Sequence, residues 1–361
     1  MDVSQVFAAG TSIWLDDLSR AKLEGSAAHS LPSRIANCAV VGVTTNPSIF
    51  NSAITGANEY AADISHMKDL DPQEVVQKLT TDDVRKACDL LKDIYTATKG
   101  VDGRVSIEVD PRLAHDTQAT IEAGKTLWKI IDRPNVMIKV PATLEGLPAI
   151  TALIASGISV NVTLIFSVKR YGAVIDAFMS GVEQNTNPTH VHSVASFFVS
   201  RIDSAIDSLL LKSASAEAHA LLGKAAIANA HLAYQLFEEK FASARWSAQQ
   251  ERGANKQRPL WASTGVKNPD YDDTRYVVEL IAPETVNTMP QATLDALLDH
   301  GVVRGDTITD QYSAAVETLK GLSSVGISLD AITTELEIDG VKKFAQAWEE
   351  LLENVKVAQQ Q

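Results

Sequence analysis

The sequence predicts one α/β domain of the (β/α)8 TIM-barrel type, in which parallel strands alternate with helices. Short runs rich in β-branched residues recur along the chain, and longer stretches with helical periodicity lie between them, which is the sequence form of successive βα units. A length of 361 residues also suits one barrel with insertions. The runs expected to form the strands are 12–16, 41–46, 105–110, 136–141, 159–166, 192–198, 258–264 and 284–290.

Two connections between these runs are much longer than the others, at about 47–104 and 199–257. Both are rich in helical periodicity, and no Pro-, Gly- or Ser-rich linker separates them from the rest of the chain. We therefore interpret them as helical insertions in a single domain over residues 1–361. The polar stretch WSAQQERGANKQR (246–258) is expected to be a loop.

Further helices are predicted from about residue 291 to the C-terminus. The segment FAQAWEELLENVKV (344–357) is amphipathic, so it is expected to pack across the barrel or to lie at a subunit interface.

Composition narrows the classes of partner. The formal net charge of −13 argues against a nucleic-acid partner, and an anionic substrate would need a local basic pocket. No apolar run reaches membrane-spanning length, and the N-terminus lacks a secretory signal, so a cytoplasmic protein is expected. Cys38 and Cys88 form no disulfide framework, and the histidines are scattered, so no metal site is predicted.

Polar residues interrupt the apolar strand runs on one face only. In the run 136–141, alternation directs Val136, Ile138 and Val140 towards the helices and Lys139 into the barrel. Such residues near the carboxyl ends of barrel strands lie where active sites are built. The polar side chains that the same alternation directs into the barrel are Asp16, Thr44, Asn46, Ser106, Glu108, Asp110, Asn161 and Thr163.

Lys139 is the most informative of these residues, because a buried ammonium is costly unless it is paired or loses its proton. One interpretation is a structural ion pair with Glu108 or Asp16. The other is a nucleophilic amine that forms a Schiff base with a carbonyl substrate, which requires that desolvation keep the amine neutral against the pull of nearby carboxylates. Asp16 is also placed to hold substrate hydroxyls or to assist proton transfer.

The neighbouring polar residues have two interpretations each. Glu108 is the best candidate to move protons through a water molecule, but a salt bridge to Lys139 fits the pattern equally well. Thr163 is placed to fix that water, although threonine is also an ordinary strand residue. Asn46 and Asp110 each precede a proline, so the first also fits a helix N-cap and the second a strand-ending turn.

Five segments in this order resemble the transaldolases of the pentose phosphate pathway. They are GVTTNPSIF (42–50), VSIEVD (105–110), NVMIKVPAT (135–143), ISVNVTLIFS (158–167) and VASFFVSRID (194–203). The likeness extends from about Ser12 to about Pro290, and WASTGVKNP (261–269) resembles the longer bacterial branch of the family.

The resemblance implies a circularly permuted barrel of the class I aldolase type that needs no cofactor and no metal. The implied reaction transfers a dihydroxyacetone unit between ketose and aldose phosphates, from sedoheptulose 7-phosphate to glyceraldehyde 3-phosphate, giving erythrose 4-phosphate and fructose 6-phosphate. The implied partners are sugar phosphates, with no nucleic acid and no membrane. A monomer and a homodimer both remain open.

The resemblance also implies roles for individual residues. Lys139 corresponds to the Schiff-base lysine, Glu108 to the acid/base that acts through water, and Thr163 to the residue that holds this water. Arg201 corresponds to a phosphate ligand, as a bidentate guanidinium suits a phosphate monoester. A second phosphate arginine of the shorter transaldolases is replaced here by Lys267, with Ser263 as a helper. The residues that correspond to positions around the dihydroxyacetone hydroxyls are Asp16, Asn46, Asn161 and Ser196.

Two rival functions remain. A related lyase splits fructose 6-phosphate and releases free dihydroxyacetone, but relatives of that kind tend to carry glutamine and tyrosine at the positions of Glu108 and Phe198. The other rival is a catalytically silent barrel that only binds sugar phosphates, since a fold alone does not guarantee an activity. Intact Lys139, Glu108 and Thr163 oppose it.

Overall fold

The computed structural model describes residues 3–24, 27–55 and 57–360. Eight parallel strands close into a barrel in the order β1 to β8, with β8 paired to β1. The predicted fold class is confirmed. The strands are β1 (Thr11–Leu15), β2 (Gly42–Val43), β3 (Arg104–Glu108), β4 (Val136–Pro141), β5 (Val160–Ile165), β6 (Ser193–Phe198), β7 (Gln257–Ala262) and β8 (Thr285–Met289).

Six of the strands end one to three residues earlier than the sequence pattern predicts, and at β2 and β3 this changes where polar residues lie. β2 has only two residues, so Thr44 and Asn46 follow the ladder instead of belonging to it. β3 ends at Glu108, and the Asp110 side chain accepts a hydrogen bond of 3.0 Å from the backbone N–H of Arg112. The prediction that Asp110 points into the barrel is therefore wrong, and the strand-ending turn is the correct interpretation.

Helices fill every long connection. Those between neighbouring strands outside the two insertions are α2 (Arg20–Leu23), α3 (Leu31–Cys38), α8 (Thr117–Ile131), α9 (Gly146–Ala155), α10 (Val168–Gln184) and α15 (Arg275–Val278). Helix α1 (Ser4–Ala8) precedes β1, and the short 3-10 helices are η1 (Pro111–Leu113) and η2 (Pro188–His190).

Both insertions are helical, as predicted. The first contains α4 (Pro47–Ile54), α5 (Asn58–His66), α6 (Pro72–Leu90) and α7 (Lys92–Ala97). The second contains α11 (Ser200–Leu210), α12 (Ala216–His219), α13 (Ala225–Phe241) and α14 (Ala244–Glu251). Val75 of α6 and Phe237 of α13 belong to the same buried core as the strands, so we propose that the chain folds as one domain.

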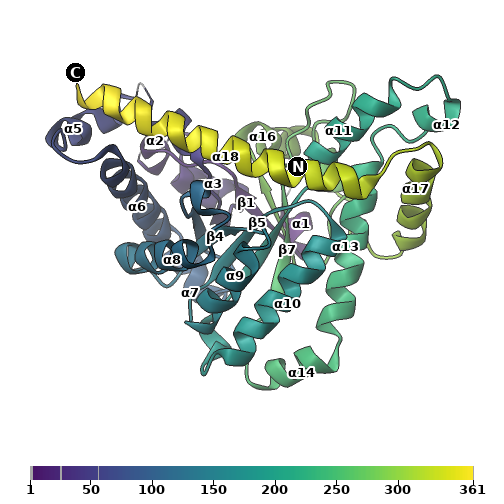
Figure 1. Ribbon diagram of the computed structural model, residues 1–361, viewed down its shortest axis with the longest axis horizontal. Coiled ribbons are helices and arrows are strands. Elements are labelled where there is room, and N and C mark those ends of the chain that lie inside the picture. Colours follow the sequence, from purple (N-terminus) through teal and green to yellow (C-terminus); the bar gives the residue numbers. More distant parts are fainter. Residues whose placement is uncertain (1–2, 25–26, 56, 361) are drawn as a thin grey trace.

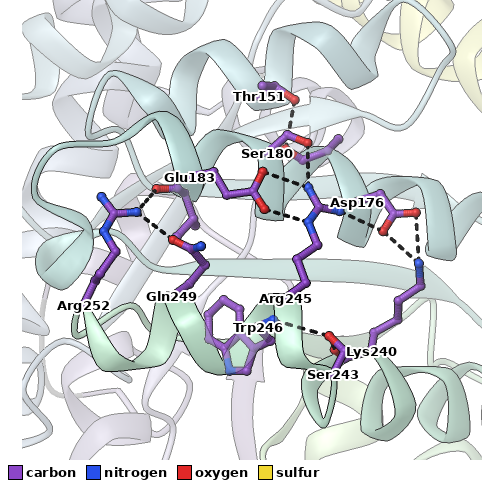
Figure 2. A network of polar contacts seen from close by, with 12 residues as sticks. Thr151, Asp176, Ser180, Glu183, Lys240, Ser243, Arg245, Trp246, Gln249 and Arg252 are labelled. Carbon is purple, nitrogen blue, oxygen red and sulfur yellow. Dashed lines mark hydrogen bonds and ion pairs between the residues drawn. The ribbon is translucent and has the colours of Figure 1, made fainter.

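The prediction of a loop over residues 246–258 is wrong for its first half, which lies in α14. The Ser243 side chain caps this helix at the N–H of Trp246, and the Trp246 ring is fully buried at 4.8 Å from the ring of Phe241. Figure 2 shows Arg245 between Glu183 and Asp176 of α10, with Nε–Oε1 2.7 Å and Nη1–Oδ1 3.3 Å. A single buried tryptophan among polar residues gives no periodic signal, and this explains the error.

The C-terminal part of the chain forms α16 (Gln291–His300), α17 (Tyr312–Ser324) and α18 (Leu329–Gln359). Figure 1 shows α18 in yellow crossing the molecule, and it contacts α4, α5 and α6 as well as α11. Its buried face repeats about every four residues, at Gly340, Phe344, Trp348 and Leu351. The prediction that this segment packs across the barrel is confirmed. None of the helices described is both long and apolar enough to span a bilayer.

Candidate active site

A cavity of about 200 Å³ opens at the carboxyl ends of the strands, and we call it the mouth pocket. Its wall brings together seven of the ten residues predicted from the sequence: Asp16, Asn46, Lys139, Ser196, Arg201, Ser263 and Lys267. Thr44, which strand alternation directs into the barrel, and Phe198, which the sequence reasoning used against the rival lyase, also line the wall. The wall residues that the sequence reasoning did not single out are Ser48, Ala262, Gly265, Thr288, Pro290 and Phe344. Glu108, Asn161 and Thr163 lie outside this wall.

Lys139 projects from the middle of β4 and is only 4% exposed. Its Nζ donates a hydrogen bond of 3.1 Å to the carbonyl oxygen of Thr45. The nearest carboxylate oxygen, Oε2 of Glu108, lies 3.9 Å from Nζ. This distance lies within ion-pair range but is longer than a charge-assisted hydrogen bond, so the two groups attract each other without a direct hydrogen bond.

Glu108 lies beside Lys139 in the strand ladder and is 5% exposed. Neither of its carboxylate oxygens has a hydrogen-bond partner among the described residues. Burial raises the pKa of this carboxyl to about 7, because the charged form is desolvated; Lys139 lowers the pKa and Asp16 raises it. A carboxyl group with a pKa near 7 is suited to both taking and giving a proton at neutral pH.

Thr163 continues the inward face of β5 beyond Asn161, and its buried Oγ1 also has no hydrogen-bond partner among the described residues. The pairing of β5 with β6 shifts directly after this part of the strand, and Leu164 has a φ of +60°. Such irregularities are frequent beside active sites, where they redirect side chains. Unpaired buried hydroxyl and carboxylate groups therefore lie on either side of β4, which carries Lys139.

Threonine hydroxyls hold the Asp16 carboxylate in place. Thr44 Oγ1 donates a hydrogen bond of 2.6 Å to Asp16 Oδ1 and lies 2.7 Å from Thr288 Oγ1. Asn46 is the N-cap of α4, because its Oδ1 accepts a hydrogen bond of 3.0 Å from Ile49 N–H. The same residue lines the mouth pocket, so both interpretations of Asn46 are compatible with the structure.

Asn161 and Ser196 form one hydrogen-bonded row. Ser196 Oγ donates a hydrogen bond of 2.7 Å to Asn161 Oδ1, and Asn161 Nδ2 donates one of 3.0 Å to Ser106 Oγ. Asn161 is fully buried, and only Ser196 reaches the wall of the mouth pocket. In this structure the contact of Asn161 with the pocket is therefore indirect.

Part of the wall of the mouth pocket is basic, because it includes Arg201 and Lys267, and we call this part its basic side. Arg201, in the first turn of α11, lies with its guanidinium carbon 5.2 Å from the centre of the Phe198 ring and 6.0 Å from that of Phe344. Its Nη1 is buried without a hydrogen-bond partner among the described residues. Burial lowers the pKa of Arg201, although Asp339 and Asp16 raise it.

Lys267 and Ser263 complete this basic side. Lys267 is exposed at the rim of this wall and forms no ion pair with the described residues. Ser263 has a φ of +54°, which is unusual for a residue other than glycine, and its Oγ lies 3.0 Å from Ser200 Oγ. The local basic pocket that an anionic substrate would need is thus present in an acidic chain.

Phe344 shows what the sequence reasoning missed. It belongs to α18, yet it lines the mouth pocket, with its ring centre 6.0 Å from Nζ of Lys139. The amphipathic pattern predicts a buried face for this helix but does not specify the strand ends that it covers. Within the described ranges, no group of three or more His, Cys, Asp or Glu is placed to hold a metal ion.

Comparison with known proteins places the chain in a family. The sequence model of transaldolase/fructose-6-phosphate aldolase matches residues 13–355. The chain is 53% identical to a transaldolase of Thermobifida fusca over 364 aligned residues, which cover 99% of this chain and 98% of that protein. It is 55% identical to a transaldolase of an Arthrobacter species, with 98% and 96% covered, and 55% identical to transaldolase 1 of Streptomyces avermitilis, with 96% and 92% covered. The chain therefore belongs to the transaldolase/fructose-6-phosphate aldolase family.

Proposed function

We propose that this chain is a transaldolase that transfers a dihydroxyacetone unit from a ketose phosphate to an aldose phosphate through a Schiff base on Lys139. The observation that carries the proposal is the buried Lys139 amine, which faces a basic pocket and lies 3.9 Å from a carboxylate oxygen that has no hydrogen-bond partner among the described residues. Relatives named transaldolase match nearly the whole chain, which supports the same function.

The reaction begins when the neutral Lys139 amine attacks the ketone carbon. A C–N bond forms, and the ketone oxygen leaves as water with one proton from the nitrogen and one from Glu108, so that Lys139 carries a protonated Schiff base and Glu108 becomes a carboxylate. The proton of Glu108 passes through a water molecule that Thr163 holds. Glu108 then takes the proton of the C4 hydroxyl, and the C3–C4 bond breaks. The aldose phosphate leaves, while the electron pair of the broken bond stays on the enamine.

The second half of the reaction reverses these steps with a new partner. The enamine carbon attacks the aldehyde carbon of the acceptor, whose oxygen receives the proton from Glu108. Water then hydrolyses the imine, which releases the new ketose phosphate and regenerates the amine. We place Asp16, Asn46 and Ser196, backed by Asn161, around the hydroxyls of the dihydroxyacetone unit.

The terminal phosphate is assigned to the basic side of the mouth pocket. Arg201 offers a guanidinium with a buried nitrogen that lacks a partner among the described residues, and Lys267 offers a second cation. Ser263 is placed to donate a hydroxyl hydrogen bond to the same phosphate.

We also propose that sugar phosphates are the substrates and that the protein works in the cytoplasm. Both cysteines, Cys38 and Cys88, are free and buried, which suits a reducing compartment.

Replacement of Lys139 tests the Schiff base. Borohydride added together with fructose 6-phosphate should leave a reduced sugar adduct on the peptide that contains Lys139, detected by mass spectrometry. Lys139→Met should lose both the adduct and the transfer activity, because the nucleophilic amine is gone. Lys267→Met, a matched change in the same pocket, should still form the adduct. An unmodified Lys139 in the wild-type protein would favour the rival function, a catalytically silent barrel that only binds sugar phosphates.

Glu108 should set the acid limb of the pH profile. Because burial raises its pKa to about 7, the ionised fraction falls as pH drops below 7, and kcat should fall with it towards tenfold per pH unit. Glu108→Gln should lower kcat by about 10²- to 10⁴-fold and remove this limb. Glu239→Gln, a change of an exposed carboxylate on α13, should keep this limb. If the acid limb of the pH profile persists in Glu108→Gln, the titration belongs to another group.

Arg201 should contribute mainly to phosphate binding. Loss of a charge-assisted hydrogen bond costs about 1.5–3 kcal/mol, so Arg201→Ala should raise KM for fructose 6-phosphate by about 10- to 100-fold. The reaction with unphosphorylated dihydroxyacetone donors should change little. An equal loss with both kinds of donor would mean that Arg201 supports the fold of the pocket and not the phosphate.

The need for an acceptor aldose phosphate distinguishes a transaldolase from the rival lyase. With fructose 6-phosphate alone, a transaldolase retains the enamine and should release almost no free dihydroxyacetone, whereas addition of erythrose 4-phosphate should start rapid turnover. Sustained release of dihydroxyacetone without an acceptor, measured by a coupled reduction of that ketone, would establish the lyase instead.

A further inference from the structure

Glu108 lines a second cavity that is distinct from the mouth pocket. This side pocket, of about 90 Å³, lies between β3 and the helices α4, α6, α8 and α18, and includes Glu108, Gln77, Ala123 and Trp348 in its wall. The mouth pocket touches Lys139 but not Glu108, and the side pocket touches Glu108 but not Lys139. Asn46 is the one residue that both walls share. The Lys139–Glu108 pair therefore stands between two cavities.

The side pocket has the chemistry of a hydrated passage. Its wall includes Glu108, whose two carboxylate oxygens are buried without a hydrogen-bond partner among the described residues, and Trp348, whose buried indole N–H also lacks one. Burial of such groups without any partner costs about 1–3 kcal/mol each, which water bridges would offset. One water needs roughly 10–15 Å³, so the volume of about 90 Å³ holds more than one.

The pocket also reaches the protein surface. Gln73, at its outer end, is exposed, and Gln77, one helical turn further along α6, is half-buried. The Gln77 side chain forms no hydrogen bond to any described residue, so its amide is free to bind water. The rest of the wall combines apolar side chains such as Phe50 and Leu127 with the polar Thr80 and Asp110.

The proposed reaction needs such a passage. Imine formation releases one water and imine hydrolysis consumes one, while the sugar phosphate fills the mouth pocket above Lys139. Phe344 of α18 covers the same opening. Water that approaches Glu108 from behind avoids the substrate altogether.

We propose that the side pocket is the route by which water and protons exchange between solvent and Glu108 while the substrate occupies the mouth pocket. This inference rests on the proposed Schiff-base function. It assigns Gln77 and Trp348 to the transport of water, in positions that contact neither the substrate nor Lys139.

Exchange of oxygen isotope measures this transport directly. Wild-type protein with fructose 6-phosphate in H₂¹⁸O should introduce ¹⁸O at the ketone carbon, because each cycle of imine formation and hydrolysis replaces that oxygen. Lys139→Met supplies the uncatalysed rate. Ala123→Leu fills the side pocket from α8 and should slow exchange and kcat at least fivefold, with KM and the extent of borohydride trapping unchanged. Ala152→Leu is the matched control, because Ala152 is also half-buried and lies on α9. In this variant the exchange rate, kcat, KM and the extent of trapping should stay at the wild-type level.

Gln77→Leu is the second variant, and it carries the test if Ala123→Leu fails to fold. It removes the polar group at a half-buried position, and exchange should again slow while trapping remains. Exchange at the wild-type rate in a folded Ala123→Leu or Gln77→Leu protein would refute the passage. A parallel loss of trapping would mean that Lys139 itself is disturbed, and the passage would again be rejected. Absence of any adduct in the wild type would instead overturn the proposed function.

Discussion

The burial of one amine and one carboxyl group in adjacent strands governs the rest of this site. Lys139 and Glu108 are paired in register between β4 and β3, and both are almost fully removed from solvent. Desolvation penalises the charged form of Glu108, while the attraction of Lys139 favours it. At 3.9 Å the two groups attract each other but are too far apart for a direct hydrogen bond. Desolvation prevails at Glu108 and raises the pKa of its carboxyl to about 7.

The barrel supplies the rigidity that this balance requires. Side chains alternate along each strand, so Ile138 and Val140 face the helices while Lys139 faces the interior, and a strand held on both sides cannot shift. The threonine pair Thr44 and Thr288 fixes the polar groups at the rim. Hydrogen bonds between these fixed side chains orient Asp16 before a substrate arrives, which reduces the reorganisation needed during the reaction.

Most of the barrel and much of the site could be predicted from the sequence, because strand alternation and strand order are local patterns. Lys139, Arg201 and Lys267 meet in one pocket as expected, since the carboxyl ends of parallel strands converge. Asp110 was misplaced because the pattern does not mark where a strand ends. Phe344 was missed because its position beside Lys139 depends on how a distant helix crosses the barrel, and no local signal encodes that crossing.

That crossing helix links the two cavities. Phe344 lines the mouth pocket and Trp348, one helical turn later, lines the side pocket. Gly340 allows the close approach, since a Cβ there would lie 3.0 Å from a methyl carbon of Leu164 at the end of β5. Because both aromatic residues lie on one rigid helix, a displacement of α18 would change both cavities together. If the side pocket carries water as proposed, α18 would thus couple access of the substrate to access of water.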